Sequence, residues 1–222
     1  MIHKLIVVGV LGMLISVHAR AQFENLELSV GPGRTSTHGD QNDGYGLSYD
    51  PLYNYSISVG TRYKMTTRSG LKARLIFEDR GSKGSINYRF IDEGDPIIGA
   101  NKPTYKANVK CLTLPVLYSF QFGSKVKFSL DVGPHLSYEL NTRTTAYTST
   151  GTSSYNDQSN EPFRFGATVS FGMDIPVTDK LGITVGFLDN LSIATIGDSS
   201  NQINTNTLNL LTGVRYTLKQ KS

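Results

Sequence analysis

The chain has 222 residues, the length of one domain, and its formal net charge at pH 7 is +4. This small positive balance includes no run of Lys and Arg, which argues against a nucleic-acid partner. The single cysteine, Cys111, excludes an intramolecular disulfide.

The N-terminus has the pattern of a secretory signal peptide. Lys4 gives a basic start, Leu5–Val17 is an apolar run of 13 residues, and Ala19-Arg20-Ala21 supplies a small-x-small cleavage pattern. The apolar run is too short to cross a bilayer as a helix. We therefore expect residues 1–21 to be a cleaved signal peptide and residues 22–222 to form an outer-membrane β-barrel domain.

Beyond the leader, apolar and polar residues alternate with a period of two, which indicates β-strands. No segment there is apolar for 18 consecutive residues, so a transmembrane helix is excluded. Many of the predicted strands have the length of about 9–11 residues that a tilted membrane-crossing strand needs. The eight predicted strands are residues 23–32, 54–66, 70–80, 109–122, 125–140, 163–176, 180–189 and 206–218.

The predicted connections alternate between long and short. Short turns are typical of the periplasmic side of an outer-membrane barrel and long loops of the outside, with both termini inside. The long loops are rich in Thr, Ser, Asn, Asp, Gly and Tyr. The long connections are 33–53, 81–108, 141–162 and 190–205, and the short ones are 67–69, 123–124 and 177–179.

One face of each predicted strand is apolar along its length, as in the run Leu26, Leu28 and Val30. Aromatic residues gather near both strand ends on this face, which is the pattern of two aromatic girdles at the membrane interfaces. The girdle expected at the turn end comprises Tyr63, Phe120, Phe122, Phe128 and Tyr216, and the girdle at the loop end comprises Tyr55, Phe77, Tyr138, Phe163 and Phe165.

The opposite face carries charged residues together with glycines such as Gly60, Gly133 and Gly213. Alternation does not say which face points inward, and a soluble lipocalin-like ligand-binding barrel would place the apolar face inside. Glycine weakens an exposed strand, whereas in a narrow eight-stranded lumen it makes room for long charged side chains. The predicted fold is therefore an all-β, eight-stranded antiparallel up-and-down transmembrane barrel with a polar, filled lumen.

The lumen side chains carry both signs, and buried charges must be paired. The loop 141–162 is expected to place Glu139 opposite Arg164. Barrel closure would bring Glu27 towards Arg215. Arg62, Arg74 and Lys72 are expected to form ion pairs with Glu78, Asp131 and Glu27. The expected lumen charge network comprises Glu27, Arg62, Arg74, Glu78, Asp131, His135, Glu139, Arg164 and Arg215.

A few polar residues could also form a catalytic or metal site instead of a lumen charge network. His135, Ser137 and Glu139 share a strand face, as in a lipid A deacylase-like barrel enzyme, but residues two apart on a strand lie about 7 Å apart. Asp40, Asn42, Asp43 and Asp50 could ligate calcium, but their spacing matches no calcium loop. We therefore expect no enzyme, no metal and no cofactor, with Cys111 as a structural thiol. Pro115 and Pro134 are expected to mark β-bulges.

Two segments resemble the PorT-like outer-membrane β-barrel family. Residues 109–118 resemble its strand with a central proline, carried here by Pro115, and residues 128–138 resemble its following strand with a Gly-Pro pair, here Gly133-Pro134. The resemblance covers most of the mature chain. Cys111 and His135 depart from it, since aromatic residues are usual there. It implies an outer-membrane barrel and, through the founding member, an association with a protein-secretion machine.

These observations predict an integral, non-conducting barrel of the cell outer membrane. Its partners would be the lipid bilayer and a protein or surface ligand at the long loops, or the barrel would support a larger membrane assembly.

Overall fold

The computed structural model describes residues 23–39, 46–87, 104–148, 151–157, 162–195 and 203–218. The predicted leader, residues 1–21, lies outside these ranges. So do Asp40, Asn42 and Asp43 of the segment considered for calcium binding. Among the described residues, no helix is long and apolar enough to cross a membrane.

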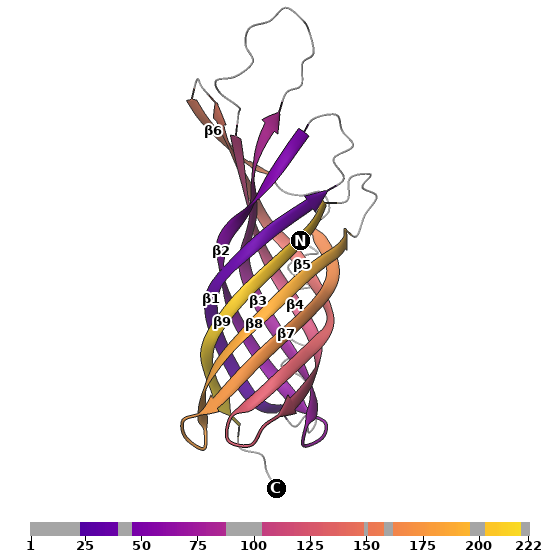
Figure 1. Cartoon of the computed structure of the whole chain (residues 1–222), viewed down its shortest axis with the longest axis vertical. Helices are drawn as coiled ribbons and strands as arrows, with labels where there is room; N and C mark the ends of the chain where they lie inside the picture. Colours follow the sequence, from indigo (N-terminus) through magenta and orange to yellow (C-terminus); the bar gives the residue numbers. More distant parts are fainter. Residues whose placement is uncertain are drawn as a thin grey trace, which may run out of the picture.

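Eight antiparallel strands form a closed, tilted barrel (Figure 1). Each strand pairs with its neighbours in the chain, and closure comes from pairing of the first strand with the last. The barrel strands are β1 (Phe23–Gly39), β2 (Gly46–Lys64), β3 (Ser69–Asn87), β4 (Thr104–Phe122), β5 (Lys127–Thr148), β7 (Phe163–Pro176), β8 (Leu181–Thr195) and β9 (Ile203–Thr217).

The strands reach much further into the predicted loops than the alternation indicated. β3 extends to Asn87 and β4 begins at Thr104, so the predicted loop 81–108 is partly strand. A ninth strand, β6 (Gly151–Asp157), pairs with the end of β5 and makes a hairpin within the predicted loop 141–162. Polar Thr, Ser and Asn residues in these segments pair as β-structure above the barrel body (Figure 1), although their composition is typical of loops.

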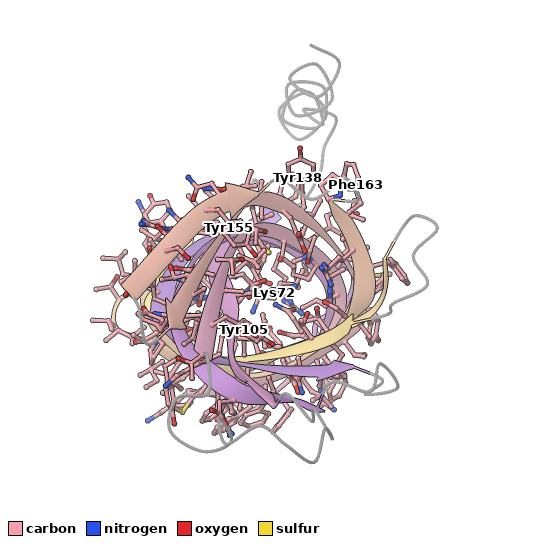
Figure 2. All side chains as sticks on the ribbon, turned by 90° about the horizontal axis from the view of Figure 1, so that it is seen from above. Lys72, Tyr105, Tyr138, Tyr155 and Phe163 are labelled. Atoms are coloured by element: carbon pink, nitrogen blue, oxygen red, sulfur yellow. The ribbon has the colours of Figure 1, made fainter. Side chains whose placement is uncertain are left out.

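The apolar strand faces point outward, as the glycines indicated. Leu26, Leu28 and Val30 are each about half exposed, whereas Glu27 and Ser29 between them are buried. The opposite arrangement, a soluble barrel with an apolar interior, is therefore wrong. Figure 2, a view down the barrel, shows Lys72 inside the wall and the girdle residues Tyr138 and Phe163 on its outer side.

The uncharged outer face has a limit at the loop end. Asp79 follows Phe77 on the outward face of β3, and Asp189 follows Phe187 on that of β8. The turn end is marked instead by stacked rings from Phe120 through Phe122 and Phe128 to Phe171. The apolar band therefore ends at stacked phenylalanine rings on the turn side. On the loop side it ends at the Tyr138–Phe163 ring pair together with these two aspartates.

The two strand prolines do not mark bulges. Pro115 pairs in register with His135, and Pro134 pairs in register with Ala167. The register between β4 and β5 shifts instead between Lys110 and Cys111. Both prolines are accommodated within regular pairing, so that prediction is wrong.

Candidate functional site

The lumen is the candidate functional site, because the inward side chains of all eight barrel strands converge there. We divide it into a turn-side cluster, an apolar layer, a loop-side cluster and an outer vestibule. Side chains alternate between the two faces of a strand, so every second residue points inward. Successive inward residues of each strand therefore contribute to successive levels of the lumen.

The turn-side cluster contains charges that share partners. Glu27 of β1 forms ion pairs with Arg74 and with Lys72, and the Lys72 Nζ lies 3.4 Å from the Glu27 carboxylate. The same Nζ lies 3.4 Å from Asp131 of β5. Lys72 therefore joins two carboxylates from strands on different parts of the wall.

Two further ion pairs complete the turn-side cluster. Arg62 binds Glu24, and the Arg215 Nε lies 2.9 Å from Asp174. Glu27 and Arg215 are direct backbone partners, yet their side chains turn to different ions. A cavity of about 30 Å³ lies among these groups, enough for roughly one or two water molecules.

An apolar layer lies beyond the turn-side cluster. Ile76, Leu188 and Leu211 point inward, are almost completely buried and contact one another. Their strand positions fall between the turn-side charges and the next polar level, since Arg74, Ile76 and Glu78 are successive inward residues of β3. This layer is not predicted by the alternation pattern, because its three apolar residues lie singly on strand faces that are otherwise polar.

The loop-side cluster is centred on one ion pair with many neutral neighbours. The Arg80 Nη2 donates to Glu78 at 2.5 Å and to Thr113 at 3.1 Å. Glu78 also accepts from the amides of Asn190 and Asn209, each at 3.4 Å. Arg80 is the last residue of the predicted strand 70–80 and is not among the predicted network residues. It lies two residues after Glu78, so its side chain points to the same inward face.

His135 and Ser137 belong to this level and bond to different partners. The His135 Nδ1 lies 2.9 Å from the Thr168 hydroxyl, and the Ser137 hydroxyl lies 2.9 Å from that of Thr113. Arg80 also donates to Ser137 at 3.3 Å. His135 is thus bonded to the neighbouring strand β7, and Ser137 is bonded to its direct backbone partner on β4.

The outer vestibule is a pocket of about 250 Å³ at the loop end of the lumen. Arg80 and Cys111 reach its inner part, and Tyr105 lines its wall; Figure 2 shows Tyr105 on the wall of the barrel in this view. Glu139 and Arg164 form an ion pair at its side.

The Glu139–Arg164 pair forms in a register that differs from the predicted one. Ser137, not Glu139, lies opposite Arg164, and Glu139 donates its backbone N–H to Pro162. The predicted register is wrong by two residues. A shift of two leaves every side chain on its original face, so the two charges still meet diagonally.

No group of three or more His, Cys, Asp or Glu side chains among the described residues could hold a metal ion.

Comparison with known proteins gives relatives in structure and a family in sequence. No curated protein sequence matches the chain. Similar solved structures include Neisserial surface protein A (14% identity, TM-score 0.43, covering 87% of this chain and 97% of that one). They also include OprG from Pseudomonas aeruginosa (11% identity, TM-score 0.43, covering 89% of this chain and 97% of that one). The protease OmpT from Escherichia coli is similar too (11% identity, TM-score 0.47, covering 90% of this chain and 98% of that one).

A family model described as outer membrane protein beta-barrel domain matches residues 17–195, most of the chain. This match agrees with the outward apolar band and the filled polar lumen, and it places the protein in the outer membrane. The chain belongs to the outer membrane protein beta-barrel domain family.

Proposed function

We propose that this protein is a non-conducting, non-enzymatic outer-membrane barrel, exported by the cleaved leader 1–21, whose loop end docks a protein or surface ligand. In the manner implied by the PorT-like resemblance, it supports a membrane assembly such as a protein-secretion machine. The observation that carries the non-conducting part is the apolar layer between two charged clusters.

Ions would meet three successive obstacles in the lumen. The turn-side charges hold one another, the Ile76, Leu188 and Leu211 side chains exclude water, and the Glu78–Arg80 pair fills the level beyond. Apolar constrictions stop ions because water leaves them. The small turn-side cavity supports the same view.

Planar-bilayer recording tests this part directly. Purified full-length protein should give no stable conductance steps, while a known outer-membrane channel in the same bilayer gives them. Ohmic single-channel steps that scale with the amount of inserted barrel would refute the closed lumen.

The docking part of the proposal rests on the β5–β6 hairpin, which projects beyond the apolar band (Figure 1). Its Tyr155 side chain is 57% exposed, and exposed tyrosines are favoured at protein interfaces. A photo-crosslinking amino acid at Tyr155 should capture a defined partner in intact cells. The same group at Lys125, in the β4–β5 turn, is the control and should not capture it. Equal capture at both positions, or none at Tyr155, would contradict docking at the hairpin.

The non-enzymatic part is supported by the separate hydrogen bonds of His135 and Ser137. Deleting the gene should leave the acylation of lipid A unchanged in mass spectra. An acylation change restored by wild-type protein but not by His135→Ala would establish the lipid-modifying alternative instead.

A further inference from the structure

A group of cations lies on the outside of the barrel, just beyond the loop-end limit of the apolar band. It consists of Lys83 of β3, Lys106 and Lys110 of β4, and Arg143 of β5, and we refer to it as the outer basic patch. Lys83, Lys110 and Arg143 are exposed. The lumen network described above uses none of these four residues.

Strand parity fixes the direction of the patch. Tyr105, Ala107 and Val109 line the vestibule, so the alternating positions Lys106 and Lys110 face away from the lumen. Pairing brings the strands together, because Lys83 lies directly opposite Lys106. Arg143 lies opposite Asn108, the outward residue between the two β4 lysines.

The depth of the patch follows from the length of the apolar run on β4. Residues 112–122 span about 33 Å along the strand. At a tilt of about 40° this corresponds to roughly 25 Å along the barrel axis, which is the height of the apolar band in such barrels. Lys110 is the next outward residue, so the patch begins at the level of the lipid headgroups.

The patch has an excess of positive charge. Asp79 lies opposite Lys110 and Asp50 lies opposite Lys83, which leaves four cations against two carboxylates. Asp79 interacts electrostatically with Lys110 and Lys106, but among the described residues none of the four cations forms an ion pair within 4 Å of a carboxylate. Like charges directly opposite on neighbouring strands are destabilising, as for Lys83 and Lys106. An anion bound between them would remove this repulsion.

We propose that the outer basic patch binds the phosphorylated headgroup of an outer-leaflet glycolipid of the lipid A type. Phosphate oxygens accept charge-assisted hydrogen bonds from Lys, and Arg offers them two parallel donors. The acyl chains of the same lipid would lie against the apolar outer face below, which a soluble phosphate cannot use. Binding at this surface does not depend on the state of the lumen. Arg143 pairs with Asn156 of β6, so the patch borders the β5–β6 hairpin, and a detergent titration without any partner protein isolates the lipid contribution.

The test uses full-length protein in neutral detergent micelles, titrated with bisphosphorylated lipid A. The patch variant carries Lys106→Gln, Lys110→Gln and Arg143→Gln. The control carries Arg68→Gln, Lys125→Gln and Lys180→Gln, three exposed cations in the turns at the other end. Wild type and control should bind equally, and the patch variant should bind at least about tenfold more weakly. Heat-modifiable gel mobility confirms that each barrel is folded.

Two further probes separate the lipid from its phosphate. Dephosphorylated lipid A should bind wild type and patch variant alike, at the weak level of the patch variant with intact lipid. Inorganic phosphate at millimolar concentration should not displace lipid A. Equal binding of intact lipid A by patch variant and control would overturn the proposal, as would full displacement by inorganic phosphate. A variant with Lys106→Arg and Lys110→Arg should keep wild-type affinity, because its charge is unchanged.

Discussion

The turn-side and loop-side clusters solve the problem of buried charge in different ways. In the turn-side cluster several ions share partners, and Lys72 contacts both Glu27 and Asp131 beside a small cavity. In the loop-side cluster one carboxylate, Glu78, holds one guanidinium, Arg80, and neutral hydroxyls and amides supply the remaining bonds. A charged side chain with two partners keeps one of them when the other is mutated, whereas a member of an isolated ion pair keeps none. The two clusters should therefore tolerate the same substitution very differently.

Glu78→Gln should have the largest effect. It leaves the completely buried Arg80 without its counter-ion and places an amide donor beside it, so the free energy of unfolding should fall by about 3–5 kcal/mol. Urea unfolding of the reconstituted barrel measures this. Glu78→Leu combined with Arg80→Leu should lose less than Glu78→Gln. A loss below 1 kcal/mol for Glu78→Gln would mean that water reaches this level.

The Glu139–Arg164 pair at the vestibule should show an intermediate effect. Glu139→Ala leaves the half-buried Arg164 facing the pocket and should cost about 2–3 kcal/mol in the same unfolding experiment. Glu139→Ala with Arg164→Ala should cost less than the single change, because no cation is then left without its carboxylate. Losses in the reverse order would contradict the pairing.

Glu27→Gln should cost only about 1.5–2 kcal/mol, the lower part of the range for hydrogen bonds to a charged group. Lys72 keeps Asp131 as a partner, and the neighbouring cavity can admit water beside Arg74. This is the same chemical change as Glu78→Gln, so the two variants form a matched pair. Equal losses for both would remove the distinction between the clusters.

Ser29→Ala should have the smallest effect. Its hydroxyl bonds that of Ser58 at 2.8 Å between β1 and β2, and among the described residues neither serine bonds a charged side chain. Losing one neutral bond should cost about 1 kcal/mol. A shift in the denaturant midpoint as large as that of Glu27→Gln would indicate that the hydroxyls also help to hold the charged groups.

The sequence predicted the barrel, its strand count and the direction of its faces, because a period of two is independent of exact strand ends. Glu27 and Leu28 reveal their faces even if the strand begins one residue earlier. The partner of each charged side chain was harder to predict from the sequence. Arg215 lies opposite Glu27 in the backbone but binds Asp174, since long side chains reach diagonally across a narrow lumen.

Two other features escaped sequence reasoning for different physical reasons. The β5–β6 hairpin is built from Thr, Ser and Tyr, whose loop-like composition hides strand pairing that continues from the barrel body. The Ile76, Leu188 and Leu211 layer interrupts a face that is otherwise polar, and single apolar residues there give no pattern of their own. The inward position of Arg80 could have been predicted, because it lies two residues after Glu78 on the same strand.

The pairing of β1 with β9 also constrains the order of assembly. Gly39 pairs with Ile203 and Asn25 with Thr217, so the closing contacts join residues far apart in the chain. Until β9 is available, β1 and β8 both present unpaired backbone groups, and each such group costs several kcal/mol inside a bilayer. The barrel therefore cannot seal strand by strand as the chain emerges. Its precursor must be kept from pairing with other edges until the whole sequence can insert together.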